Sequence, residues 1–385
     1  MRVRAVVFWV HLSAAVAAGG IVLILCLTGA TLVFARQIQE WSERGVRRPG
    51  APAAESVRLT LDEALLRAKR AQPAWPFMEA TLFADPKYAF ALSTEDHRTL
   101  FVNAYTGQVQ VEPEPAFQRF FQVAGLLHTR LNLDAGQPFA AAANVVFLVL
   151  ACSGLCLWWP HAWRWAAVRP SIWFVKGASG RAREWNWHNV VAIWFLPALI
   201  VLAGTGVVLS YRSVNAEMFR LAPIFMKPAA SNQRSTASPA VQPAARLSIP
   251  STLDSFAARV AAGVPGWESI YINFYPPQGG SVTGAGGAPF KGFEAVVIRA
   301  AAWPPFATTL ASLDPATGAL RLGDTYASAP PGRRARMWVR TLHSGDAFGN
   351  PGRIIACLTC LAGCLLVYTG YAMALRRLAR RLRGA

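Results

Sequence analysis

Long apolar runs alternate with longer mixed segments along the chain. The apolar runs lie near residues 7–34, 139–159, 189–211 and 354–375. A helix of about 20 apolar residues crosses a hydrocarbon core of roughly 30 Å, so each run predicts a membrane-spanning helix. The first run exceeds the roughly 7 to 15 apolar residues of a signal peptide and has no small-residue cleavage site, so we expect it to be retained. The pattern predicts an α-helical membrane protein with a four-span bundle.

Composition and charge support this class and give the bundle an orientation. Of 385 residues, 54% are hydrophobic and only 15% charged, more apolar than a soluble core requires. Lysine and arginine, which produce the net charge of +18, gather before the first span, between 160 and 187, and after the fourth span. Short basic segments stay in the cytoplasm, so both termini and the 160–187 loop are predicted to be cytoplasmic, beside anionic membrane lipid. No recognition motif accompanies the charge, so nucleic acid is excluded as a partner.

The two long segments between the spans carry the same series of elements. Each begins with an amphipathic helical stretch, from Arg58 in the first and from Arg246 in the second. Strand-like sequences follow at 79–83, 88–92, 99–111, 269–275, 293–300 and 307–322. A Thr-Gly pair marks a turn in each segment, at 106–107 and 317–318, and the Gly-rich stretch from 276 predicts a long hairpin loop. The chain is therefore predicted to be a duplication about a pseudo-two-fold axis along the membrane normal, with an α+β module in each half.

One histidine lies near the start of the first span and one near the start of the third. His11 is followed by a Thr-Gly pair at 28–29, and His188 is followed at the same offsets by a Thr-Gly pair at 205–206. We take the Thr-Gly pairs as marks of duplicated span ends, where a small residue permits close packing. No chemistry is assigned to them.

A second histidine in each half precedes a span. His128 lies in "LLHTRLNLDAG" and His343 lies in "TLHSGDAFGNPGR", both within amphipathic basic stretches that we expect at the outer membrane interface. A two-fold axis along the normal places His11 opposite His188 near the cytoplasmic face. The same axis places His128 opposite His343 near the outer face.

Facing imidazoles at one depth suit a metal porphyrin bound from both sides. Ionisable groups inside a membrane are costly and usually functional, so we expect each pair to ligate one haem iron. Bis-histidine ligation leaves no open coordination position and suits electron transfer. The alternative interpretation is that these histidines anchor the chain beside interfacial tryptophans. His97 and His161 have no counterpart in the other half, and we expect both to be structural.

All six cysteines fall inside the predicted spans, so no disulfide framework is predicted. Cys357 and Cys360 form a CxxC motif, and Cys152 and Cys156 form a CxxxC motif. Cysteine packs well as a small apolar residue, so packing is favoured over metal or redox chemistry.

Together these motifs resemble the PepSY-associated transmembrane family. The resemblance rests on His-x16-Thr-Gly in the first and third spans, the two histidine stretches, "SGLCLWW" and the Thr-Gly turns, and it covers essentially the whole chain. One departure is "VYTGYAMALRR" in the fourth span, which lacks the Trp pair that ends the second. The family includes bacterial inner-membrane ferric-siderophore reductases and other iron-uptake-associated proteins. It implies an inner-membrane location, two periplasmic PepSY-like modules, and haem b held by histidines, here His11, His128, His188 and His343.

The predicted function is that of an oxidoreductase. We expect transmembrane electron transfer through haem b to reduce a ferric chelate, such as a ferric siderophore, on the periplasmic side and release ferrous iron. The chain lacks a GxGxxG fingerprint between a strand and a helix, so a quinol or a cytoplasmic reductase must supply the electrons. Arg130 and Arg340, near the outer pair, are candidates for contacts with haem propionates or an anionic chelate; otherwise they are interfacial anchors.

Two other functions stay open. One is a haem-free PepSY scaffold that binds peptides or regulates a partner protease or transporter. The other is a permease for the chelate, which four spans without broken helices or intramembrane carboxylates favour less. Catalytic residues are not assigned.

The predicted segments, in chain order, are the first span (1–35), the first PepSY-like module (36–116), an amphipathic histidine stretch (117–137), the second span (138–159), a cytoplasmic loop (160–187), the third span (188–211), the second module with its linker (212–332), another histidine stretch (333–352), the fourth span (353–375) and a basic cytoplasmic tail (376–385).

Overall fold

The computed structural model describes residues 2–49, 56–95, 98–111, 115–226, 253–274, 293–299, 303–313, 320–323 and 325–383. The chain forms two compact units. We call the first the membrane unit; it consists of Met1–Arg36, Phe117–Phe225 and Ala335–Ala385. The second, the sheet unit, consists of Gln37–Ala116 and Met226–Arg334.

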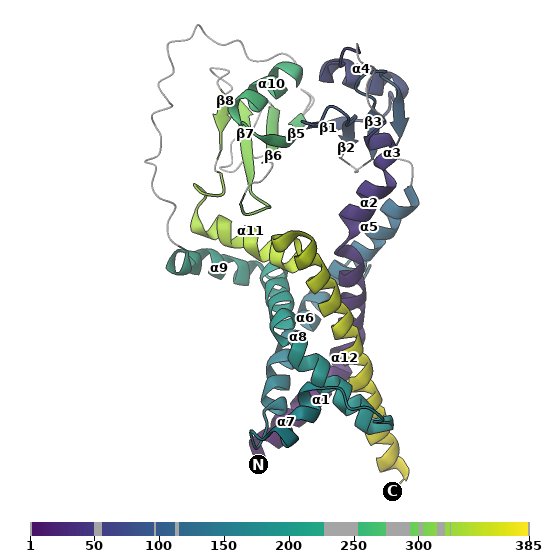
Figure 1. Ribbon diagram of the computed structural model, residues 1–385, viewed down its shortest axis with the longest axis vertical. Coiled ribbons are helices and arrows are strands. Elements are labelled where there is room, and N and C mark those ends of the chain that lie inside the picture. The colour runs from purple at the N-terminus through teal and green to yellow at the C-terminus, as the bar shows by residue number, and fades with distance from the viewer. Residues whose placement is uncertain are drawn as a thin grey trace. The chain divides into compact units, whose positions relative to one another are not determined.

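Four long helices form the membrane unit. They are α1 (Arg2–Leu32), α6 (Gln137–Trp158), α8 (Gly180–Ser210) and α12 (Gly349–Arg383). Within the described residues, four helices are long and apolar enough to cross a membrane, which confirms the prediction of four spans. α1 packs against α6 and α12, and α8 packs against the same two helices, so each helix has two neighbours in the bundle (Figure 1). Helices can cross a lipid bilayer because their backbone hydrogen bonds are satisfied within the helix.

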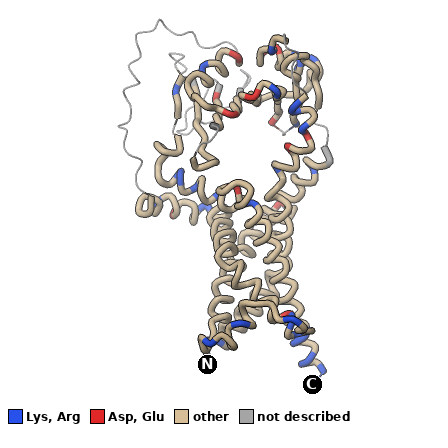
Figure 2. Tube along the Cα trace, in the orientation of Figure 1, with Lys and Arg blue, Asp and Glu red and all other residues tan. Residues whose placement is uncertain are grey.

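Both chain termini lie at one end of the bundle, which we call the terminal end (Figure 1). Lysine and arginine gather there (Figure 2). A short helix, α7 (Trp165–Ile172), packs against α8. The buried side-chain amide of Asn186 fixes this connection by donating to the carbonyl oxygens of Pro170, at 2.6 Å, and Trp173, at 3.0 Å. Its oxygen accepts from the Val175 backbone at 3.1 Å.

Three shorter helices belong to the opposite end, which we call the distal end. α5 (Pro115–Arg130) precedes α6, α9 (Arg212–Phe225) follows α8, and α11 (Pro331–Ser344) precedes α12. α5 and α11 form within the two amphipathic histidine stretches identified in the sequence. Gly345, with a φ of 78°, ends α11 in the left-handed region that favours glycine, and a 3-10 turn (Asp346–Phe348) leads on to α12.

The sheet unit contains one antiparallel sheet, whose eight described strands follow the order β4-β3-β2-β1-β5-β6-β7-β8. The strands are β1 (Phe77–Phe83), β2 (Phe90–Thr94), β3 (Thr99–Val102), β4 (Val109–Val111), β5 (Trp267–Phe274), β6 (Phe293–Arg299), β7 (Thr308–Leu313) and β8 (Leu320–Leu322). The strand-like sequences therefore form strands. The central pairing runs from Glu79 opposite Asn273 to Phe83 opposite Ser269. This pairing joins the two α+β segments in one sheet, which the local sequence pattern does not predict.

Helices α4 (Leu61–Ala71) and α10 (Leu253–Gly263) share one hydrophobic core with the sheet. Leu92, Phe256 and Ile270 are fully buried within it, as the alternation of apolar residues along the strands requires. The remaining described helices are α2 (Ala35–Ser42) and α3 (Arg44–Arg47). The turn expected at 317–318 and the Gly-rich loop expected from 276 lie outside the described residues.

Two aspartates cap the N-termini of α4 and α10 reciprocally. The Asp254 carboxylate accepts from the backbone nitrogens of Leu61, at 2.7 Å, and Asp62, at 2.9 Å. The Asp62 carboxylate accepts from the backbone nitrogens of Leu253 and Asp254, both at 3.1 Å. Each side chain thus satisfies donors that a helix leaves free at its first turn. Burial raises the pKa of Asp254, and its hydrogen bond with Asp62 raises it further.

We expect Asp62→Ala to lower the free energy of unfolding of the sheet unit by about 1 kcal/mol, because α10 loses its side-chain cap. Thermal unfolding of the full-length protein in detergent measures this change. Glu95→Ala is the matched control, because Glu95 is exposed in the turn after β2. Equal midpoints for the two variants would contradict a stabilising role for the reciprocal caps.

Candidate functional site

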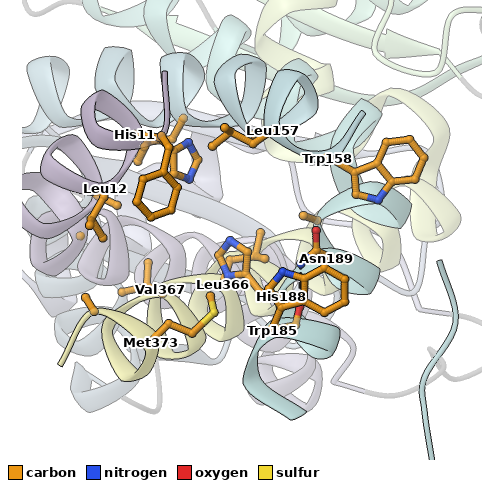
Figure 3. Close-up of a pocket in the computed structure, with 18 of the residues that line it drawn as sticks. His11, Leu12, Leu157, Trp158, Trp185, His188, Asn189, Leu366, Val367 and Met373 are labelled. Carbon is orange, nitrogen blue, oxygen red and sulfur yellow. Dashed lines mark hydrogen bonds between the residues drawn. The ribbon is translucent and has the colours of Figure 1, made fainter. Parts of the chain in front are cut away.

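The structure arranges the four histidines in two pairs. At the distal end, His128 of α5 and His343 of α11 have ring centroids 6.1 Å apart and ring planes inclined by 52°. At the terminal end, His11 of α1 and His188 of α8 line one cavity. Figure 3 shows their imidazoles entering this cavity from opposite sides. His11 is thus brought together with His188, and His128 with His343.

The terminal cavity has a volume of about 1070 Å³, at the upper end of the roughly 300 to 1,000 Å³ of small-molecule sites. Leucine, valine and alanine side chains of all four spans form much of its wall. Four basic residues also line it: Arg4, Arg181, Arg377 and Arg380. In the sequence, basic residues of this kind indicate only the orientation of the chain, because nothing in their local spacing shows that they surround a common cavity.

In each of the four histidines, the Nδ1 atom of the imidazole forms a hydrogen bond with a serine or threonine hydroxyl group. The Nδ1 to Oγ distances are 2.9 Å for His11 and Ser153, 3.0 Å for His128 and Thr28, 2.9 Å for His188 and Thr369, and 3.1 Å for His343 and Thr205. The pairs at 28–29 and 205–206, which the sequence analysis treated only as small span ends, therefore have a chemical partner. That partner is the second histidine of each half and not the histidine on the same span. The contributions of Ser153 and Thr369 were missed altogether.

Hydrogen-bond directions place the ring proton on Nδ1. The Thr28 hydroxyl donates to the Ile24 carbonyl oxygen at 2.6 Å, which leaves its oxygen to accept from His128. His128 Nδ1 also lies 3.1 Å from the Leu25 carbonyl oxygen, which can only accept. The same bonds recur at the other histidines: the hydroxyls donate from Ser153 to Val149 at 2.7 Å, from Thr205 to Val201 at 2.6 Å and from Thr369 to Leu365 at 2.8 Å, and His343 Nδ1 lies 3.0 Å from the Leu202 carbonyl oxygen. A neutral ring protonated on Nδ1 keeps the lone pair of Nε2 for a ligand.

Burial favours the neutral form of both distal histidines. Burial lowers the pKa of His128 to about 4, and the neighbouring His343 lowers it as well. Burial also lowers the pKa of His343. Neutral imidazole is the form that binds metal ions, so each distal ring keeps a nitrogen lone pair that can bind one.

The distal pair has a spacing that fits a metal ion bringing most of its own ligands. Two imidazoles that bind one ion from opposite sides at about 2.0 Å each have ring centroids roughly 6 Å apart, and the distal rings are 6.1 Å apart. Within the described part of the chain, no cluster of three or more histidine, cysteine or acidic residues is suited to hold a metal, and the six cysteines are free thiols. A porphyrin would supply the remaining ligands of such an ion. The apolar walls of the terminal cavity suit its macrocycle, and the cavity arginines suit its propionates.

The other candidate residues have different positions. Arg130 and Arg340 are exposed near the distal pair, on α5 and α11. His161 lines the terminal cavity, with its Nε2 atom 2.7 Å from Nη1 of Arg4. Its place in the cavity was not expected from the sequence. His97 lies outside the described residues.

The fold and the site define a membrane protein of four helices with an anchored histidine pair at each end of its bundle and an attached antiparallel sheet. The chain matches the family described as PepSY-associated TM region over residues 8–377 and belongs to that family. The matched range contains both histidine pairs. A comparison with curated proteins finds no match.

An ion pair beside His188 ties α8 to α12. The Glu184 side chain, which is 4% exposed, pairs with the Arg376 guanidinium at 2.9 Å through both carboxylate oxygens. Glu184 lies one helical turn before His188. Because the hydrogen bonds are charge-assisted and one partner is buried, they contribute more than an exposed pair would.

We therefore expect Glu184→Gln to lower the free energy of unfolding by about 1 to 3 kcal/mol. Glu217→Gln is the control, because Glu217 and Arg220 form an exposed pair on α9 and such pairs contribute about 0 to 1 kcal/mol. Midpoints of thermal unfolding in one detergent give the comparison. A larger loss for Glu217→Gln would contradict the assignment.

Proposed function

We propose that this protein transfers electrons across the bacterial inner membrane through two bis-histidine haem b groups and reduces ferric chelates, such as ferric siderophores, on the periplasmic side. The observation that supports this proposal is the presence of one Nδ1-anchored histidine pair at each end of a membrane bundle. A single pair would suit a local cofactor. Two pairs at opposite ends suit a path through the membrane.

Different groups of residues would bind the haem iron, fix the histidine rings, exclude water and bind the haem carboxylates. His11 and His188 would hold the iron of one haem at the terminal end, and His128 and His343 would hold the iron of a second haem at the distal end. The four hydroxyls that contact Nδ1 keep the ring proton there and would leave Nε2 free to bind the iron. Apolar cavity walls exclude water, and the cavity arginines bind carboxylates. Bound haem with two histidine ligands supplies reversible one-electron transfer.

The distal end is the proposed site of chelate reduction. Arg130 and Arg340 are exposed there and carry the positive charge that an anionic ferric chelate requires. Hard oxygen donors bind ferrous iron less strongly than ferric iron, so reduction favours release of the metal. This assignment places the distal end on the periplasmic side and the basic terminal end (Figure 2) in the cytoplasm.

The two halves of the chain have equivalent tasks. The pseudo-two-fold duplication accounts for two histidine pairs of the same chemistry, with each half contributing one histidine to each pair. The sheet unit then corresponds to two periplasmic PepSY-like modules. Electrons enter at the terminal end from a quinol or a cytoplasmic reductase.

We expect the protein, expressed with a full haem supply, to bind two haems per chain with low-spin b-type spectra. His188→Ala should lose one of them and keep the other, because the distal pair is untouched. His128→Ala should lose the distal haem instead. Haem content by the pyridine haemochromogen method and optical redox spectra measure both effects.

His161→Ala is the matched control, because His161 lines the same cavity but is bonded to Arg4; this variant should keep both haems. Ferric chelate reduction by the reduced protein should fall with the loss of either haem. The alternative is a haem-free PepSY scaffold. A wild-type protein without haem would favour it, and so would a variant that lacks all four paired histidines and still has the wild-type activity in cells.

A further inference from the structure

We infer that four Ser/Thr–Gly dipeptides are positioning sites for the paired histidines and set the reduction potentials of the groups that these histidines hold. We call each dipeptide a seat. The seats are Thr28-Gly29, Ser153-Gly154, Thr205-Gly206 and Thr369-Gly370. The inference rests on the proposed function, and it assigns to the seats a role that is exerted through the histidines.

The same arrangement occurs at all four histidines. Each seat lies on a membrane-spanning helix, and its hydroxyl contacts Nδ1 of a histidine from another helix at 2.9 to 3.1 Å. The following glycine faces Cε1 of the same ring. One such contact is an ordinary packing detail. Four contacts with the same atoms, in the same order, indicate a common requirement.

The glycine of each seat lets the ring approach the helix. A Cβ atom at Gly206 would lie 3.1 Å from Cε1 of His343 and 2.7 Å from Nδ2 of Asn144. At Gly29 the corresponding distance to His128 is 3.4 Å. The contacts at the other two glycines are longer: a Cβ at Gly154 would lie 3.6 Å from Cε1 of His11, and a Cβ at Gly370 would lie 3.8 Å from Cε1 of His188. The distal seats are therefore the tighter ones.

The hydroxyl of each seat acts on the ring electronically. When Nδ1–H donates to an oxygen, the opposite nitrogen becomes a stronger electron donor to a bound metal. Stronger donation stabilises the oxidised iron and lowers its reduction potential. Removing the acceptor should therefore raise the potential of that site and leave the other site unchanged.

The four histidines differ in whether Nδ1 keeps a second hydrogen-bond acceptor when the seat hydroxyl is removed. His128 and His343 keep a carbonyl acceptor, from Leu25 at 3.1 Å and Leu202 at 3.0 Å. His188 likewise has a backbone hydrogen bond with Leu366. For His11, the Ser153 hydroxyl is the one acceptor found among the described residues. Ser153→Ala should therefore have a larger effect than Thr28→Val.

The first test is a redox titration of the full-length, haem-loaded protein. We expect Ser153→Ala to raise the potential of the terminal haem by about 59 mV, which corresponds to a tenfold change for one electron and to the low end of the 10- to 100-fold effects of such outer ligands. Thr28→Val should raise the reduction potential of the distal haem by a smaller amount. Thr28→Ser, which keeps the hydroxyl, should have the wild-type potential. Thr31→Val is the control, because the Thr31 hydroxyl donates to the Leu27 carbonyl oxygen of its own helix, at 2.9 Å, and contacts no histidine among the described residues.

The second test compares glycines on one helix. Gly206→Ala should displace His343 and alter the low-spin electron paramagnetic resonance signal of the distal haem or reduce its occupancy. Gly204→Ala should leave both unchanged, because a Cβ at Gly204 meets no atom within 4 Å. Gly370→Ala should also be tolerated, since its Cβ would make an ordinary contact with His188.

The outcomes separate the two proposals. A wild type without haem overturns the proposed function and this inference with it. A wild type with two haems, combined with unchanged potentials in both Ser153→Ala and Thr28→Val, overturns the inference alone. Equal shifts from Thr31→Val and Thr28→Val would also overturn it, because the effect would then not depend on contact with the histidine.

Discussion

The hydrogen bond from a buried imidazole Nδ1 to a hydroxyl is the interaction on which this site depends. A buried polar group without a partner is costly, so an imidazole inside an apolar bundle requires an acceptor at a defined position. The hydroxyl at Thr28 or Thr205 meets this need because its own proton is already engaged by a carbonyl of the same helix. The opposite ring nitrogen is then left for a ligand. Position, tautomer and accessibility of the ring thus follow from one contact.

The same hydrogen bonds also join the helices. His11 ties α1 to α6 and His188 ties α8 to α12, while His128 and His343 tie α5 to α1 and α11 to α8. In lipid, helices gain little from hydrophobic association with each other, so close packing at small residues and polar contacts carry more of the stabilisation. Glycine in each seat provides the first and the hydroxyl provides the second. Tyr371 adds a further link between α12 and α1 by donating to the Val16 carbonyl oxygen at 2.9 Å.

The sequence predicts the elements of this protein better than the contacts between them. Hydropathy locates the four spans and alternation locates the strands, because both signals depend on residues close together in the chain. Equal offsets after His11 and His188 indicate a repeated arrangement, yet they suggest that Thr28 belongs with His11. The structure joins Thr28 to His128, 100 residues away. The hydroxyl of Ser153, the cavity arginines and the β1–β5 pairing are likewise tertiary contacts, and no local periodicity encodes them.

The second and fourth spans each contribute to both ends of the bundle. Ser153 and Thr369 hold the terminal histidines, and nine residues earlier on the same helices stand Asn144 and Cys360. Asn144 covers the seat glycine Gly206, and the Cys360 sulfur lies 3.1 Å from a Cβ built at Gly29. Each of these two helices therefore carries one terminal seat and contacts one distal seat, although neither carries any of the four histidines. The positions of the seats at the two ends thus depend on the packing of the same two helices.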